Sequence, residues 1–86
     1  MLTDKQKQFL INYLPEDSMF TSQKEIEIIT HHLGTNKEIR NDVVKFYRNL
    51  MESENILTQK GYYRTAKYDN YMIAMQSVVA AIDFNF

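Results

Sequence analysis

The sequence contains no cysteine and no tryptophan, and its 86 residues include one proline and two glycines. Without cysteine, the chain has neither a disulfide framework nor a thiolate metal site. Two glycines are too few for most phosphate-binding loops, and no P-loop or nucleophile elbow is present. These absences predict a protein that is not an enzyme and that uses no cofactor.

Long apolar runs are also missing. The most apolar segment, residues 71–82, is too short to span a bilayer. The polar N-terminus, MLTDKQKQF, does not resemble a cleavable signal. A composition of 44% hydrophobic and 24% charged residues is ordinary for a globular protein. We therefore expect one soluble, cytoplasmic domain over residues 1–86, with no membrane contact.

Charge is unevenly distributed along the chain, although the net charge is only −1. Residues 37–67 carry seven Lys or Arg against four Asp or Glu, a net of +3, while residues 1–36 and 68–86 each carry −2. A net charge of −1 is unlike the positive net charge of many nucleic-acid binders. The concentration of positive charge in residues 37–67 nevertheless favours a negatively charged partner for that stretch.

Local signals predict four helices and two short strands. The helices are expected over residues 2–14, 22–33, 35–52 and 70–82, and the strands over residues 56–58 and 62–68. Pairs with the spacing of a capping box open the first three helices: Thr3 with Gln6, Ser22 with Glu25, and Thr35 with Glu38. Pro15 ends the first helix and Gly34 closes the second. Met19 and Phe20 form a very short strand or an anchor into the core, and Gln59-Lys60-Gly61 forms the turn between the strands.

The long third helix has two different faces. Ile39, Val43, Tyr47 and Leu50 share one face, and Lys37, Asn41, Lys45 and Arg48 project broadly the other way. The following strands add Lys60, Arg64 and Lys67. Two interpretations remain open: the polar side is a solvated face with mixed acidic residues, or it is a contact surface for DNA.

The order of elements resembles the winged helix-turn-helix fold of small bacterial and phage transcription regulators. The resemblance is carried by QKEIEIITHHLG, EIRNDVVKFYRNLMESENIL and TQKGYYRTAKY. The family's recognition-helix pattern is matched by Val43, Tyr47, Leu50, Glu54, Ile56 and Leu57, with Asn55 where glycine is usual and Gly61 at the tip of the wing. It implies a mainly α fold with a small β-hairpin, in the order helix, short strand, helix, helix, hairpin, helix. The segment between Gly34 and Val43 is a few residues longer than in the family.

The resemblance implies a sequence-specific duplex-DNA-binding protein, acting as a transcriptional regulator. The residues expected to contact DNA are Lys37, Arg40, Asn41, Lys45, Arg48, Lys60, Arg64 and Lys67. The recognition helix would read base edges in the major groove, and the wing would contact backbone or minor groove. The main alternative is a winged-helix module that binds another protein, such as a phage- or plasmid-type inhibitor or adaptor of a host protein. A part of a replication or partition complex is a third alternative.

The last helix is apolar nearly all round, so it must be covered on more than one side. We expect it to pack against a second copy in a two-fold homodimer, within the segment 70–83. The interface residues are expected to be Tyr71, Met72, Met75, Val78, Val79 and Ile82.

Two side-chain clusters have alternative explanations. His31 and His32 point ~100° apart on a helix, so they cannot bind one ion together, and no metal site is predicted. The tyrosines of the strands and of the last helix could stack on unpaired bases or cover the core with wet hydroxyls, and the second role is favoured. They are Tyr62, Tyr63, Tyr68 and Tyr71.

Overall fold

The computed structural model of the chain describes residues 1–16, 21–58, 61–62 and 66–84. In these ranges the elements are α1 (Asp4–Asn12), α2 (Gln23–Leu33), α3 (Ile39–Ser53), β1 (Leu57–Thr58), β2 (Gly61–Tyr62) and α4 (Ala66–Phe84). The predicted mainly α class is therefore confirmed. The predicted segment at Met19 and Phe20 lies outside the described residues.

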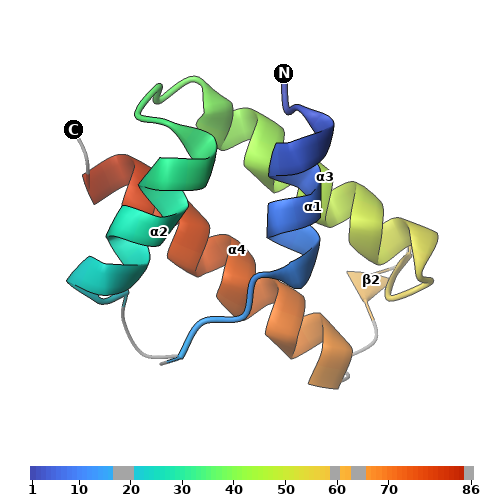
Figure 1. The fold of residues 1–86 in the computed structure, drawn as a ribbon. Coiled ribbons are helices and arrows are strands. Elements are labelled where there is room, and N and C mark those ends of the chain that lie inside the picture. Colours follow the sequence, from blue (N-terminus) through green and yellow to red (C-terminus); the bar gives the residue numbers. More distant parts are fainter. Residues whose placement is uncertain (17–20, 59–60, 63–65, 85–86) are drawn as a thin grey trace.

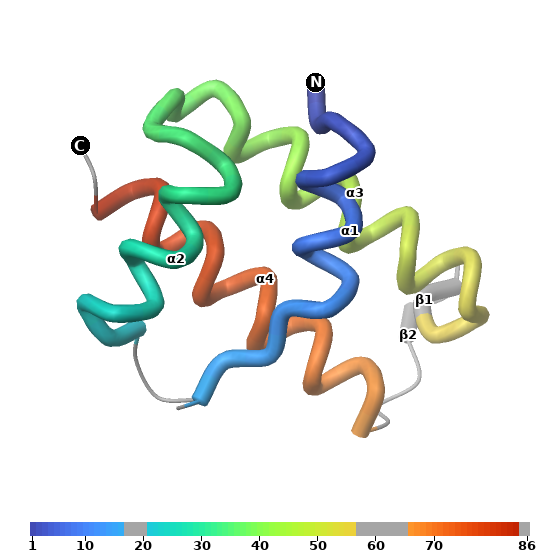
Figure 2. Tube along the Cα trace, in the orientation of Figure 1, coloured from blue at the N-terminus to red at the C-terminus, as the bar shows by residue number. Residues whose placement is uncertain are grey.

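The helices form two layers (Figure 1). α3 runs from the α2 side of the molecule toward β1 and β2, and α4 returns alongside α3 (Figure 2). α1 and α2 lie in front of this pair, and α2 also packs against α4. α4 is therefore the element against which both α2 and α3 pack.

Capping side chains start α1 and α2 as the sequence predicts. The Thr3 hydroxyl accepts from the Gln6 backbone N–H at 3.1 Å, and the Gln6 side chain accepts from the Thr3 N–H at 2.9 Å. Ser22 and Glu25 form the same reciprocal pair at the start of α2. Both pairs satisfy amides that have no partner inside the helix. α1 ends at Asn12, two residues short of the predicted end.

The start of α3 differs from the prediction. Glu38, the residue before the helix, has helical backbone angles and no side-chain cap, so the expected Thr35–Glu38 capping box does not form. The Asn36 side chain instead accepts from the Glu38 N–H at 2.9 Å, and a turn at residues 37–38 leads into the helix. A side chain two residues away can close a local turn of this kind as an alternative to a helix cap.

The end of α3 forms a Schellman motif. The Ile56 N–H donates to the Met51 carbonyl at 2.9 Å, and the Asn55 N–H donates to the Glu52 carbonyl at 3.0 Å. Asn55 has φ 60°, the left-handed conformation that asparagine tolerates more readily than most residues other than glycine. The buried Ile56 then carries the chain into β1.

The second predicted strand, over residues 62–68, is confirmed at Tyr62 and wrong at residues 66–68, which are helical; residues 63–65 lie outside the described residues. β1 and β2 pair antiparallel, with Leu57 opposite Tyr62 and Thr58 opposite Gly61. Gly61 therefore belongs to a strand rather than to the turn. The chain is already helical at Ala66, four residues before the predicted start of the last helix. Lys67, in the added turn, pairs with Glu54 at the end of α3, and tertiary contacts of this kind stabilise a helix beyond its local signals.

The core lies between α4, the inner face of α3 and the inner face of α2. Its fully buried side chains include Val43 and Tyr47 of α3 and Val78 of α4, each with 0% exposure. Leu10 of α1 and Ile29 of α2 close the core from the front layer. Ile39 and Leu50, which the sequence placed on the inner face of α3, are half-buried.

Candidate functional site

The outer face of α3 brings together three of the residues predicted to bind DNA. Asn41, Lys45 and Arg48 are all exposed, at the i, i+4, i+7 spacing of one helix face. Asn49 and Glu52 are exposed on the same side of the helix. This surface therefore combines two cations and two amides with one carboxylate near its C-terminal end.

Tyr47 fixes the rotation of α3 and so keeps this face outward. Its side chain is fully buried, and its hydroxyl donates to the Leu10 carbonyl at 3.1 Å. That carbonyl lies in the last turn of α1, where helix carbonyls have no partner within the helix. Burial raises the pKa of the Tyr47 hydroxyl far above its ordinary value, with smaller contributions from Tyr13 and Tyr71. The hydroxyl therefore stays protonated and serves as a structural donor.

Arg40 points toward the last turn of α4 instead of joining the outer face of α3. Its Nε donates to both carboxylate oxygens of Asp83, at 3.1 and 3.3 Å. Both side chains are about half exposed, at 43% and 44%. An exposed pair of this kind contributes little to stability, and a competing phosphate could replace the carboxylate.

Lys67 also has a carboxylate partner. It lies in the first turn of α4, and its Nζ is 2.9 Å from Glu54 Oε1. Hydrogen bonds from Tyr71 and from Lys67 hold the pKa of Glu54 below its usual range. Burial, together with the hydrogen bond to Glu54, raises the pKa of Tyr71 to about 12. This cluster links the end of α3 to the start of α4.

Of the three remaining residues predicted to contact DNA, the structure describes one. Lys37 is exposed in the turn before α3. Lys60 and Arg64 lie outside the described residues, as does Tyr63. The structure thus groups Asn41, Lys45 and Arg48, and it places Arg40 and Lys67 at the two ends of α4 beside carboxylates.

The predicted dimer residues on α4 fall into two groups. Val78 and Ile82 are buried in the core of the single chain, with 0% and 4% exposure, so they are unavailable to a second folded copy. The others are half-buried and pack against the same core: Tyr71, Met72, Met75 and Val79. Within the single chain, α2 and α3 both pack against α4.

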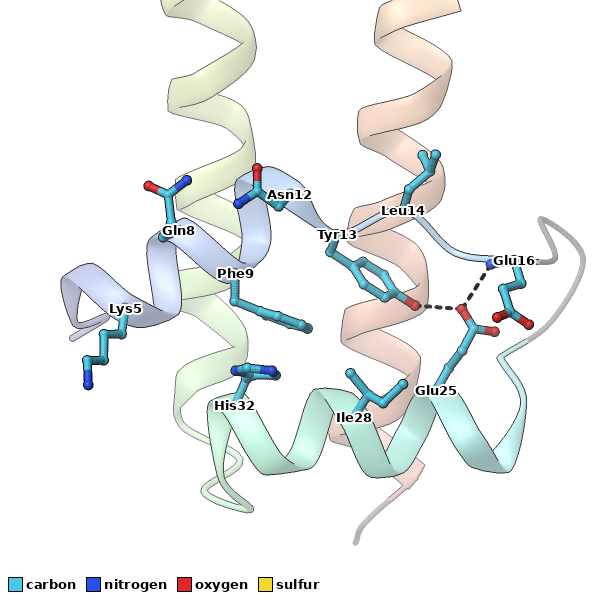
Figure 3. A pocket seen from close by; sticks show the side chains of 10 residues that line it. All are labelled: Lys5, Gln8, Phe9, Asn12, Tyr13, Leu14, Glu16, Glu25, Ile28 and His32. Carbon is cyan, nitrogen blue, oxygen red and sulfur yellow. Dashed lines mark hydrogen bonds between the residues drawn. The ribbon is translucent and has the colours of Figure 1, made fainter.

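A hollow between α1 and α2 was not foreseen from the sequence. Its volume is about 640 Å³. Figure 3 shows Phe9 and His32 at one side, Tyr13 and Glu25 at the other, and Ile28 between them along α2. Lys5, Gln8, Asn12, Leu14 and Glu16 complete its lining. On α1, residues 5, 8, 9 and 12 follow the spacing of one helix face, which is the signal that could have revealed it.

Two side-chain contacts hold the walls of this hollow. The rings of Phe9 and His32 stack with centroids 4.2 Å apart and an interplanar angle of 15°. At the other side, the Tyr13 hydroxyl donates to Glu25 Oε1 at 2.9 Å, and the Glu16 N–H donates to the same oxygen at 3.2 Å. Burial, then the hydrogen bond to Glu25, raises the pKa of Tyr13 well above its ordinary value. Glu25 therefore caps α2 and also joins α2 to the end of α1.

His31 and His32 contact each other edge to face, with centroids 5.2 Å apart. No cluster of three or more His, Asp or Glu side chains that could hold a metal ion occurs in the part of the chain that the structure describes. Within the same residues, no helix has the length and apolar character needed to cross a membrane.

The outer face of α3 and the hollow between α1 and α2 are thus the two candidate binding surfaces of the described residues. No protein-family model, curated protein or solved structure matches this chain.

Proposed function

We propose that the chain binds duplex DNA through the outer face of α3, as a winged helix-turn-helix variant that regulates transcription. The observation that supports this proposal is the exposed row of Asn41, Lys45 and Arg48 on a helix whose opposite face carries buried core residues. In this proposal α2 and α3 form the helix-turn-helix, and the segment around β1 and β2 is the wing.

The chemistry of this row suits the major groove. Asparagine forms two hydrogen bonds with adenine, and arginine or lysine contacts the acceptors of guanine. A helix fits within that groove, and rigid packing behind it limits the entropy lost on binding. Val43, Tyr47 and Met51 supply that packing here.

Backbone contacts would come from the cations around this helix. Arg40 and Lys67 would exchange their exposed carboxylate partners for phosphates, at small cost in stability. Lys37, Lys60 and Arg64 complete the proposed set. With a net charge of −1, the chain would depend on these few contacts for attraction to DNA. Affinity should then fall steeply with salt, with a slope of log K against log salt of about −5 to −7 for a dimer.

The test is fluorescence anisotropy on a site selected from a genomic-fragment pool, with a random duplex of equal length. Asn41→Ala should cost about 1–3 kcal/mol on the selected site and much less on random DNA. Lys60→Ala should weaken both duplexes similarly and reduce the salt slope by about one unit. Asn70→Ala and Lys24→Ala are matched controls, because both residues are exposed on other helices.

Two results would overturn the DNA proposal. One is the absence of duplex binding at about 50 mM salt, where phosphate contacts are strong. The other is unchanged affinity for both duplexes after Asn41→Ala and Arg48→Ala, with the fold verified by circular dichroism.

A protein-interaction module is the second candidate, and a specific observation favours it. Carboxylates interrupt the positive surface: Asp83 beside Arg40, Glu54 beside Lys67, and the exposed Glu52 beside Arg48 on α3. An interrupted positive surface suits a protein partner better than a continuous phosphate backbone. Absence of duplex binding in the experiment above would favour this candidate.

A further inference from the structure

The hollow between α1 and α2 carries exposed apolar side chains that the core does not use. Leu14 is 68% exposed and Ile28 is 41% exposed, and both line the hollow. Phe9 and Tyr13 are half-buried in its wall. Apolar surface gathered in a concave place, with a polar rim, is typical of a contact site.

The buried polar groups in the wall of this hollow already have hydrogen-bond partners. The Glu25 carboxylate is already occupied by Tyr13, Glu16 and Ser22. Among the described residues, no buried side-chain nitrogen or oxygen lacks a hydrogen-bond partner. The surface of the hollow is mainly apolar, and it suits an apolar side chain of another polypeptide.

We infer that the hollow between α1 and α2 is the contact surface for a second copy of this chain, related by a two-fold axis. In such an interface the same patch serves both copies, so it must contain a projecting part and a receiving part. Leu14 is the projecting part, because it follows the last turn of α1 at the edge of the hollow and is the more exposed of the two apolar residues. Leu14 of each copy then enters the hollow of the other.

The charges at the ends of the hollow support this arrangement. Lys5 and Glu16 lie at opposite ends, as Figure 3 shows, and both are exposed. When two copies of α1 run antiparallel across a two-fold axis, Lys5 of each copy faces Glu16 of the other. Two opposite-charge pairs then flank the apolar contact and fix its register.

This interface replaces the one expected on α4. Val78 and Ile82 are in the core, whereas Leu14 and Ile28 are exposed at the hollow between α1 and α2. The inference is independent of DNA binding, because it uses no residue of the outer face of α3.

Sedimentation equilibrium of the full chain tests the inference. We expect the wild type to be dimeric at about 50 μM and Leu14→Glu to raise the dissociation constant by more than about tenfold, as for a central apolar anchor. Ile11→Glu is the matched control: Ile11 is also on α1 and is 45% exposed, but it does not line the hollow. It should leave the dissociation constant unchanged.

Charge reversal provides the second part of the test. Lys5→Glu and Glu16→Lys should each weaken the dimer about threefold to tenfold, and the double variant should restore the wild-type dissociation constant. Lys7→Glu, at another exposed position on α1, is the control. Circular dichroism verifies the fold of each variant. A monomeric wild type at about 100 μM, or a dimer insensitive to Leu14→Glu and to both charge reversals, would overturn the inference.

Discussion

Tyr47 shows how one residue connects three helices. It belongs to α3, its ring is buried against α4, and its hydroxyl donates to the last turn of α1. The ring centroids of Tyr47 and Tyr71 are 6.4 Å apart, which places the α4 tyrosine beside it. A phenylalanine would fill the same space, but it would leave the Leu10 carbonyl without this donor. The hydroxyl is therefore the part of the side chain that specifies where α1 rests.

Tyr47→Phe should lower the free energy of unfolding by about 1–2 kcal/mol at pH 7, because the Leu10 carbonyl loses its donor. Burial raises the pKa of Tyr47 in the folded chain above the ordinary value of 10.0. The unfolded chain therefore releases the hydroxyl proton first, so wild-type stability is complete below pH 10 and declines above it. The difference in free energy of unfolding between wild type and variant should therefore shrink above pH 10. Urea unfolding at pH 7 and at about pH 10.5 measures both effects. A variant as stable as the wild type at pH 7 would contradict this role.

Short backbone motifs at the ends of α2 and α3 decide where each helix stops. α2 ends at Gly34, whose φ of 79° and ψ of −169° belong to a region that other residues rarely adopt. α3 ends in the Schellman motif around Asn55. The first motif directs the chain from α2 toward the start of α3, and the second directs it into β1. The orientation of the proposed DNA-reading face depends on both.

Gly34→Ala should lower the free energy of unfolding by about 1–3 kcal/mol. An added Cβ would meet no atom within 4 Å, so the cost is backbone strain rather than a clash. Asn55→Ala is the comparison, since its left-handed conformation is less restrictive and should cost about 1–2 kcal/mol. Urea unfolding of both variants measures the difference. Equal stability of Gly34→Ala and wild type would show that the link between α2 and α3 relaxes without loss.

At the scale of the whole molecule, α4 is the interior of the domain and α1 with α2 form its outer layer. The helix with the most apolar sequence is covered by α3 on one side and by α2 on another. A single chain thereby buries Val78 and Ile82, two of the residues expected at a dimer interface. Two exposed apolar side chains, Leu14 and Ile28, lie instead at the hollow between α1 and α2.

The variant Val78→Glu tests whether Val78 lies in the core of the single chain or at a dimer interface. If Val78 were at a dimer interface, the variant would be a folded monomer. Because its side chain is fully buried in the chain's own core, we expect the charge to abolish cooperative unfolding, a loss of more than about 4 kcal/mol. Val78→Ala, which removes volume without adding charge, should cost about 1–3 kcal/mol. Circular dichroism during urea titration distinguishes the outcomes, and a folded Val78→Glu monomer would contradict the burial.

The sequence by itself determined the features that depend on neighbours three or four residues apart. The capping pairs of Thr3 and Ser22 and the inward positions of Val43 and Tyr47 follow from local hydrogen bonding and helical periodicity. Thr35 with Glu38 has the same pattern but does not form a cap, because Asn36 closes a competing turn first.

Only the tertiary structure decided which apolar face meets which partner. Hydrophobic contacts are not directional, so the sequence could show that α4 must be covered but not what covers it. The contacts that determine the packing join residues distant in sequence, such as Tyr47 with Leu10 and Arg40 with Asp83. The hollow likewise depends on contacts between residues distant in sequence, Phe9 with His32 and Tyr13 with Glu25, which no local spacing records.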